Sequence, residues 1–270
     1  MPVIPIDDPA DARVDEYRDV GNPESIRRRD LFVAEGRLVV RRVLAGGRFQ
    51  PRSLLLSAAA HRDLHDALES WPALHVYVCG VEDFLPVTGF NMHRGCLGPV
   101  ERPAPQTPAG IVAGAKRLIL LEDVANPDNV GGVFRNAAAF GADGVLLTRH
   151  CSDPLYRKAI RTSMAAALSV PFAHFDRWPE GLRELREAGF IVAAFTPDQE
   201  AVTLDEFAQS AAGRRVACLF GAEGPGLSTE ATAAADCRVR IPICADVDSL
   251  NLAVASGIAM SRLTSTDDLE

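Results

Sequence analysis

The sequence predicts an α/β protein whose C-terminal part contains a mostly parallel sheet. After residue 110, segments of helical periodicity alternate with apolar runs of strand length: RLILLEDV, GVLLT, FIVAAF, RVACLFG and CRVRIPI. These runs are hydrophobic throughout, which indicates strands that are covered on both faces, as in parallel sheets. The expected helices lie between or after them, at residues 130–140, 156–168, 180–188 and 249–263.

A proline-rich stretch, GPVERPAPQTPAG, divides the chain into two expected domains. A chain of 270 residues is too long for one small core, and closely spaced prolines favour a semi-rigid linker. We therefore expect an N-terminal α/β domain at residues 1–98, a linker at 99–110 and a second domain at 111–270. The first domain is expected to begin with an acidic helix around residues 10–17 and to continue through LFVAEGRLVVRRVLAGG, RSLLLS, HRDLHDALES and LHVYVCG.

The composition is typical of a soluble cytoplasmic protein. Hydrophobic residues make up 47% of the chain, and no apolar stretch approaches the ~20 residues that cross a bilayer. The start of the chain has neither the basic residues nor the apolar core of a signal peptide. The six cysteines are scattered without a C-x-x-C pair, and four lie within or beside apolar runs. We expect buried, reduced thiols rather than a zinc site or a disulfide framework.

The net charge of −8 argues against nucleic-acid binding, whereas the distribution of charge argues for it. Between Arg27 and Arg52, eight arginines stand against two acidic residues. A second basic cluster consists of Arg149, Arg157, Lys158 and Arg161. Such clusters also occur as ordinary solvated surface, so charge alone leaves both interpretations open.

The stretch EDVANPDNVGGVFRNAAAFGA follows the first strand of the second domain and carries more polar residues than a helix start requires. Asp128 or Asn129 is expected to cap the helix, and Gly131 and Gly132 allow a ligand or another backbone to approach its first turn. Arg135 lies on the second turn. Its planar guanidinium suits a phosphate or a carboxylate, because it donates two parallel hydrogen bonds. A capped helix with a surface arginine is the plainer alternative.

The loop LFGAEGPGLS, at residues 219–228, follows a predicted strand and places glycines around Glu223. Its backbone amides are therefore open to a ligand. The spacing is not that of dinucleotide-binding loops, no suitably placed ribose-binding acid follows, and the G-K-[ST] of a nucleoside-triphosphate loop is absent. A nicotinamide-dependent oxidoreductase would thus rest on the glycines alone.

The third polar motif is IPICADVDSLNLAVASGIAM, at residues 241–260. It places Ser249 and Asn251 at the start of a helix. The apolar side of that helix is expected to include Leu250, Val254 and Ile258. The two aspartates before it are more typical of loop solvation and capping than of a metal site, and the histidines lack metal-ligand spacing, so we expect no metal. Among the histidines, His93 and His150 lie in polar contexts.

In this order and spacing, NPDNVGGVFRNA, LFGAEGPGLS and IPICADVDSLNLAVASG resemble the three signature motifs of the SpoU (TrmH-type) RNA ribose 2′-O-methyltransferases of the SPOUT superfamily. DPLYRKAIRTSMAA resembles the family's intervening segment, with Arg161 and Ser163 in its R-x-S positions. The resemblance covers residues 117–263. LFVAEGRLVVRRVL resembles, more loosely, the ribosomal-protein-like RNA-binding domain that many members carry. One departure is Ile243, where the family commonly has methionine.

The resemblance implies a SPOUT domain with a deep trefoil knot, at about residues 219–257, that binds S-adenosylmethionine. The alternation of strands and helices alone predicts an unknotted sheet, because knots are very rare. In the family, three loops at the knot hold the cofactor bent, largely through backbone contacts. By position, the contacts implied in this chain are Thr196, Gly221, Ile241 and Leu250.

The resemblance also implies methyl transfer to a ribose 2′-hydroxyl, the group that distinguishes RNA from DNA. By position Arg135 is the key catalytic residue, and the residues that shape the site with it are Asn129, Glu223, Ser249 and Asn251. An in-line displacement needs the oxygen behind the methyl group and the removal of its proton. Because a guanidinium stays protonated in proteins, we expect Arg135 to orient an RNA phosphate and polarise the 2′-oxygen rather than act as the base.

The basic clusters are then expected to follow the RNA backbone, with an affinity that falls as salt rises. The candidate contacts are Arg27, Arg28, Arg37, Arg41, Arg157, Lys158 and Arg161. Family members are homodimers, and the extra N-terminal domain favours ribosomal RNA, because simpler tRNA-directed members usually carry short helical extensions. Two alternatives stay open: a tRNA methyltransferase, and an RNA-binding or assembly protein on the same fold without turnover.

Overall fold

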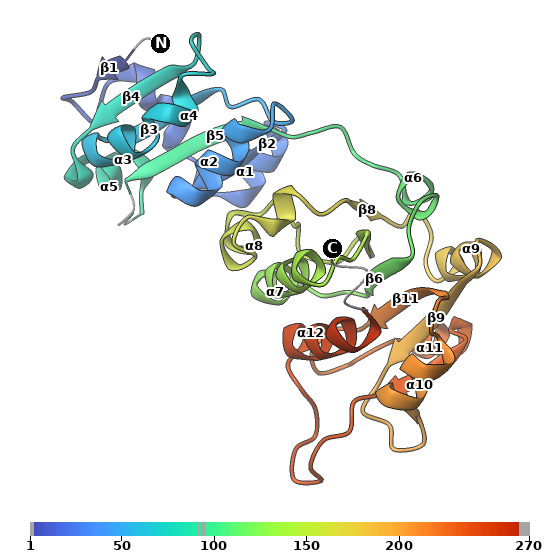
Figure 1. Cartoon of the computed structure of the whole chain (residues 1–270). Helices are drawn as coiled ribbons and strands as arrows, with labels where there is room; N and C mark the ends of the chain where they lie inside the picture. The colour runs from blue at the N-terminus through green and yellow to red at the C-terminus, as the bar shows by residue number, and fades with distance from the viewer. Residues whose placement is uncertain (1–2, 91, 93–94, 265–270) are drawn as a thin grey trace. The chain divides into compact units, whose positions relative to one another are not determined.

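The computed structural model describes residues 3–90, 92 and 95–264, so that His93 lies outside the described residues. The chain forms two compact units (Figure 1). Unit 1 comprises the residues up to Ala104 together with Leu155–Leu168, and unit 2 comprises Pro105–Pro154 and the residues from Ser169 onward. A contiguous stretch of the predicted second domain, Leu155–Leu168, thus packs with the N-terminal unit.

Unit 1 is built on a mixed sheet with the strand order β1-β4-β3-β5-β2. Its strands are β1 (Val3–Pro5), β2 (Leu31–Glu35), β3 (Ser53–Ser57), β4 (His75–Cys79) and β5 (Cys96–Glu101). Its helices are η1 (Ala12–Tyr17), α1 (Pro23–Arg28), α2 (Arg37–Ala45), α3 (Ala58–Asp63), α4 (His65–Leu68), η2 (Val81–Asp83), α5 (Phe84–Thr88), α8 (Arg157–Thr162) and η3 (Ala166–Leu168). All five residues of β2 and of β3 are buried, including Glu35 at the end of β2 and the two serines of β3.

The acidic N-terminal segment forms a helix as predicted, a 3-10 helix over Ala12–Tyr17 that is capped by Asp11. Two expectations for this part of the chain need correction. The predicted linker is shorter than expected, because β5 pairs antiparallel with β2 as far as Glu101 and α6 begins at Pro108. The predicted helix at residues 156–168 is interrupted, because Met164 and Ala165 have positive φ angles of 52° and 68°, which end a right-handed helix.

Unit 2 contains a seven-stranded sheet in the order β10-β12-β9-β11-β6-β7-β8 among the described residues. Every pairing in it is parallel, as the uninterrupted apolar runs predict. The strands are β6 (Arg117–Leu121), β7 (Gly144–Leu147), β8 (Phe172–His174), β9 (Phe190–Phe195), β10 (Val202–Thr203), β11 (Arg215–Phe220) and β12 (Cys237–Arg240). The two edge strands, β8 and β10, are short and escaped prediction.

Helices cover both faces of this sheet (Figure 1). They are α6 (Pro108–Val112), α7 (Pro127–Ala139), α9 (Glu180–Glu187), α10 (Leu204–Ser210), α11 (Thr229–Ala234) and α12 (Leu252–Leu263). On one face, α6, α9 and α11 bury residues such as Ile111, Leu182 and Ala231 in a core with the central strands. On the other face, α7 and α12 lie side by side. Among the described helices, none is both long and apolar enough to span a membrane.

The contact between α7 and α12 is close because a glycine lies within it. A Cβ atom added at Gly132 would meet the Cβ of Ala253 at 2.5 Å. Asn136 adds hydrogen bonds across the same contact: its Nδ2 donates to the carbonyl of Ala253 at 2.5 Å and to Oγ of Ser256 at 3.0 Å. Of the predicted apolar side of α12, Val254 and Ile258 lie in the helix but Leu250 does not. Both Val254 and Ile258 are exposed.

Candidate active site

A cavity of about 460 Å³ lies in unit 2 at the carboxyl ends of three neighbouring strands. Thr196 follows β9, Gly221 follows β11 and Ile241 follows β12, and the sheet order places these strands side by side. Ligands of parallel α/β sheets bind at this edge, where the loops that leave the strands converge. The four residues that the resemblance implied as cofactor contacts all line the cavity: Thr196, Gly221, Ile241 and Leu250.

The wall of this cavity includes apolar residues beyond those that were predicted as cofactor contacts. Phe195 and Phe220 end β9 and β11 and stack with ring centroids 4.6 Å apart at an interplanar angle of 21°. Ile243 and Leu252 add aliphatic surface. An aromatic residue at the end of β9 and of β11 was the available signal, but it is equally typical of an ordinary buried strand. The cavity therefore combines a flat apolar surface with exposed backbone, which suits a nucleoside.

The glycine loop folds back on itself beside the cavity. Ala222 and Gly226 form a β-bridge, with the Gly226 N–H donating to the Ala222 carbonyl at 3.0 Å. A Cβ atom at Gly221 would lie 2.3 Å from the carbonyl carbon and oxygen of Gly226. No side chain fits at position 221 without moving the loop, so glycine is required there for a steric reason.

Asn251 connects the three polar motifs. As the N-cap of α12, its Oδ1 accepts from the backbone N–H groups of Ala253 at 2.9 Å and Val254 at 3.3 Å. Its Nδ2 donates to Oδ1 of Asn129 and to Oε1 of Glu223, both at 2.9 Å. Three residues that were predicted to shape the site, each from a different motif, are thus in direct contact.

Asn129 does not cap α7, contrary to one alternative from the sequence. Asn126 is the N-cap: its Oδ1 accepts from the N–H of Asp128 at 2.9 Å, and Pro127 takes the first helical position. Asn129 is 4% exposed, and its Nδ2 has no hydrogen-bond partner among the described residues. A buried amide donor without a partner is uncommon in proteins. The Nδ2 group of Asn129 is suited to donate a hydrogen bond to a ligand oxygen at this edge of the site.

Arg135 and Ser249 differ in their positions. Ser249 is exposed and lines the cavity. Arg135 is exposed on α7, is not part of the cavity wall, and forms no ion pair or hydrogen bond with the described residues. Arg135 lies on the same helix as Asn129, which is in the first turn of α7 and contacts Asn251. Ser249 thus lies on the cavity wall, whereas Arg135 is an exposed cation outside it.

Comparison with known proteins identifies the family. The model of the SpoU rRNA Methylase family matches residues 116–261. The chain belongs to this family. It is 40% identical over 261 residues to a protein of Mycobacterium tuberculosis described as an uncharacterized tRNA/rRNA methyltransferase, covering 95% of this chain and 90% of the relative. As a SpoU family member, it is a methyltransferase.

Two solved structures share the fold of this SpoU protein. The AdoMet-bound rRNA methyltransferase from Sinorhizobium meliloti superposes with a TM-score of 0.78 at 22% identity, covering 97% of each chain. A structure described as an RNA 2′-O ribose methyltransferase superposes with a TM-score of 0.77 at 21% identity, covering 97% of this chain and 98% of the other. The α/β fold with a mostly parallel sheet is therefore that of SpoU methyltransferase structures.

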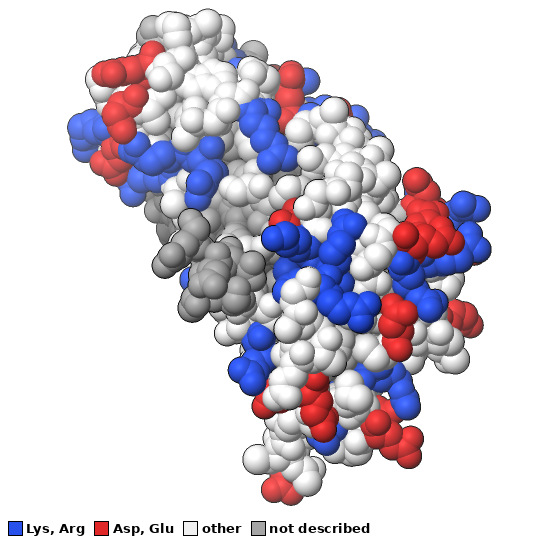
Figure 2. Space-filling view, turned by 45° about the vertical axis from the view of Figure 1, so that its right-hand side comes forward, with Lys and Arg blue, Asp and Glu red and all other residues white. Residues whose placement is uncertain are grey.

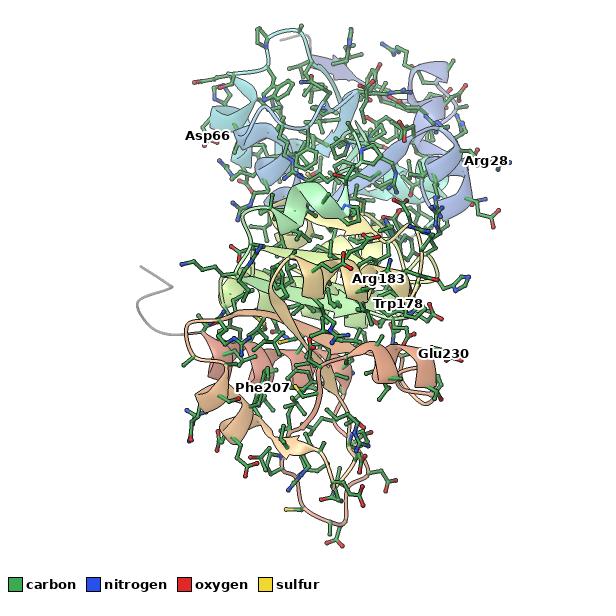
Figure 3. All side chains as sticks on the ribbon, turned by 90° about the vertical axis from the view of Figure 1, so that its right-hand side faces the viewer. Arg28, Asp66, Trp178, Arg183, Phe207 and Glu230 are labelled. Atoms are coloured by element: carbon green, nitrogen blue, oxygen red, sulfur yellow. The ribbon has the colours of Figure 1, made fainter. Side chains whose placement is uncertain are left out.

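The predicted RNA contacts of this SpoU protein fall into two groups. Arg27 and Arg28 are exposed at the end of α1, where Figure 3 labels Arg28. Arg37 is also exposed and Arg41 is half-buried, but both pair with acids: the distance from Arg37 to Asp63 is 3.0 Å and that from Arg41 to Asp66 is 2.5 Å. Exposed pairs of this kind contribute little to stability.

The second group lies on α8, where Arg157 is firmly held. Arg157 donates to the buried carboxylate of Glu35 at 2.9 Å and lies 4.2 Å from the ring centroid of Phe90. Arg161 lies 4.0 Å from the same carboxylate. Lys158 lies between them on the helix. Figure 2 shows basic and acidic side chains interspersed over the face that it views.

Proposed function

We propose that this chain transfers a methyl group from S-adenosylmethionine to a ribose 2′-hydroxyl of RNA, with ribosomal RNA as the substrate. The observation that carries the proposal is the convergence of three distant polar motifs on one cavity, where Asn251 contacts Asn129 and Glu223. S-adenosylmethionine is the cofactor, as the sequence predicts: the chain belongs to a methyltransferase family, and its fold is that of a structure with AdoMet bound.

The cavity fits S-adenosylmethionine, which does not need an anion-binding loop. The cofactor supplies an electrophilic methyl group on a positively charged sulfur. Thr196, Gly221, Ile241 and Leu250 would hold the cofactor, mainly through the backbone of the loops that leave the strands. The stacked rings of Phe195 and Phe220 end two of those strands. Glu223 places a carboxylate on the cavity wall, which favours a cation in the site.

Arg135 acts on the acceptor side of the site. A guanidinium keeps its proton, so Arg135 binds an RNA phosphate in two parallel hydrogen bonds and places positive charge beside the 2′-oxygen as it attacks. Asn129 offers a second hydrogen-bond donor on the same helix as Arg135, because its Nδ2 is buried without a partner among the described residues. Holding the two reactants in line accounts for much of the rate in such displacements.

A trefoil knot at residues 219–257 belongs to this proposal, and the strand order supports it. β12 pairs with β9, whereas α12, which follows β12, packs against α7, which follows β6. In the sheet, β9 and β6 lie on opposite sides of β11. The segment from 241 to 251 must therefore cross the end of β11, where the loop at 221–228 folds back.

We infer that two copies of the chain assemble. On α12, Val254 is 50% exposed and Ile258 is 40% exposed, and Val247 in the preceding loop is 50% exposed. Apolar residues that gather on one exposed helix face favour a protein partner. Sedimentation of the full chain at micromolar concentration is expected to give a dimer, and Ile258→Asp is expected to give a monomer. A wild-type chain that sediments as a monomer at every concentration would contradict this assembly.

Incubation with methyl-labelled S-adenosylmethionine and separate pools of ribosomal and transfer RNA tests the proposed reaction. After digestion to nucleosides, label is expected as a 2′-O-methylnucleoside from ribosomal RNA. Label in transfer RNA instead would favour the tRNA alternative, and label on a base would contradict ribose methylation. RNA that is bound but never labelled would indicate a binding protein without turnover. Cytoplasmic location stays a prediction.

A further inference from the structure

We propose that Glu122 is a positioning residue of the cofactor site, because it closes the glycine loop at both ends. The inference rests on the proposed role of that loop in binding S-adenosylmethionine. Glu122 directly follows β6, does not line the cavity and is only 4% exposed. A buried carboxylate is unfavourable unless hydrogen bonds satisfy it. Its hydrogen-bond partners therefore indicate what it holds in place.

The backbone of Glu122 fixes the start of the loop. β6 and β11 are parallel neighbours, with Leu121 opposite Phe220. One residue later, the N–H of Glu122 donates to the carbonyl of Phe220 at 2.9 Å. Gly221 begins the loop at the next position. Glu122 thus makes the last backbone hydrogen bond between these strands, and its side chain reaches the other end of the loop.

The side chain of Glu122 fixes the end of the loop. One oxygen, Oε2, accepts from the backbone N–H of Ser228 at 2.8 Å, and the other, Oε1, accepts from Oγ of Ser228 at 2.6 Å. Oε1 also accepts from the indole Nε1 of Trp178 at 2.6 Å (Trp178 is labelled in Figure 3). Ser228 in turn caps α11, where its Oγ accepts from the N–H of Ala231 at 3.1 Å.

The loop needs such a closure because its own residues do not select one conformation. Gly224 and Gly226 have φ angles of +91° and +71°, which glycine adopts easily but does not prefer over others. The same loop carries Glu223, which accepts from Asn251. A displacement of Ser228 would therefore move the cavity wall at Gly221 and Glu223. Glu122 joins this wall to β6, the strand that precedes α7 and Asn129.

Glu122→Gln tests the inference. In glutamine, an NH2 donor replaces one of the two carboxylate acceptors. Whichever way the amide turns, this NH2 faces the N–H of either Ser228 or Trp178, which then loses its acceptor. The Kd for S-adenosylmethionine, measured by calorimetry, is expected to rise about tenfold, the scale of one hydrogen bond to a charged group. The KM for the cofactor is expected to rise in parallel, and the KM for RNA to stay within about twofold. Trp178→Phe keeps an aromatic ring against Phe175, removes one donor, and is expected to raise the Kd less.

Glu35→Gln is the matched control, because Glu35 is the other buried glutamate in the described part of the chain and lies in unit 1. It is expected to leave the Kd for S-adenosylmethionine unchanged. Ser228→Ala combined with Glu122→Gln should weaken binding no more than the stronger single change, because both act on one contact. Wild-type Kd values for Glu122→Gln and Trp178→Phe would overturn the inference, and should Glu122→Gln not fold, Trp178→Phe decides alone. A wild-type chain without affinity for the cofactor would instead overturn the proposed function.

Discussion

Asn251 shows which part of a polar site is readable from a sequence at the scale of single residues. Its position before an apolar helical pattern predicts a place at the start of that helix, and it is the N-cap of α12. Its contacts with Asn129 and Glu223 join residues 122 and 28 positions away. No local pattern specifies such pairs, because they depend on the order of strands in the sheet. Only the motif resemblance brought the three residues together.

The cap of α7 shows the opposite case. The sequence was interpreted as placing the cap at Asp128 or Asn129, yet the cap is Asn126. Pro127 decides the matter, because it suits the first helical position and so makes Asn126 the cap. Asn129 is thereby free to contact Asn251. The polar residues in excess of the capping requirement are the ones that reach the site.

Arg135→Ala is expected to reduce methyl transfer at least about a hundredfold, the scale of one lost electrostatic contact in the transition state. The Kd for S-adenosylmethionine is expected to stay unchanged, because Arg135 is not on the cavity wall. Initial rates with labelled cofactor and saturating RNA measure the first effect, and calorimetry the second. Arg183→Ala is the control: Arg183, labelled in Figure 3, is an exposed arginine on α9 that pairs with Glu187 at 3.5 Å. Transfer by Arg135→Ala at the wild-type rate would remove Arg135 from the mechanism.

At the scale of elements, the long central strands were predictable and the short edge strands were not. β6, β9 and β11 are buried through nearly all their residues, so each reads as a continuous apolar run. β10 has two residues and β8 has three, which is too short for any periodicity to show. The length of the helix predicted at 156–168 was overestimated because its alanines favour helix. The positive φ angles of Met164 and Ala165 interrupt it.

The close contact of α7 and α12 makes a prediction about stability. Gly132→Ala places a methyl group 2.5 Å from the Cβ of Ala253, so the helices must move apart. The free energy of unfolding is expected to fall by about 1–3 kcal/mol, as in overpacked cores, despite the better helix propensity of alanine. Urea unfolding measures the change. Gly114→Ala is the control, since a Cβ there meets nothing within 4 Å. Equal stabilities of the two variants would refute the close packing.

At the scale of the whole molecule, composition predicted buried thiols, and the structure confirms this for Cys79, Cys96, Cys151 and Cys218. Cys237 is half-buried, and Cys244 is exposed. The prediction fails for Cys244 because the run CRVRIPI leaves the sheet after Arg240, so that the apolar residues beside Cys244 belong to a cavity loop. The sequence also did not predict that residues 155–168 belong to unit 1, because the Arg157–Glu35 contact joins distant parts of the chain.

The exposure of these thiols predicts their reactivity. Burial raises the pKa of Cys79, Cys96 and Cys218 to about 12. Because the thiolate is the reactive form, these groups stay protonated and slow to react at pH 8, and only a pH near 12 or unfolding would release them. Brief treatment with iodoacetamide at pH 8, followed by peptide mass spectrometry, is expected to modify Cys244 first. Early modification of Cys218 in the folded protein would contradict the packing of β11.

The central claim is that separate loops form one pocket for S-adenosylmethionine, and calorimetric titration of wild-type protein and Gly221→Ala tests it most directly. The added methyl group would lie 2.3 Å from the Gly226 carbonyl, so the loop must shift. The account predicts one site per chain in the wild type, binding weakened at least about tenfold in Gly221→Ala, the scale of a lost polar contact, and wild-type binding in Gly114→Ala. No saturable binding by the wild type, or equal binding by Gly221→Ala, would contradict it.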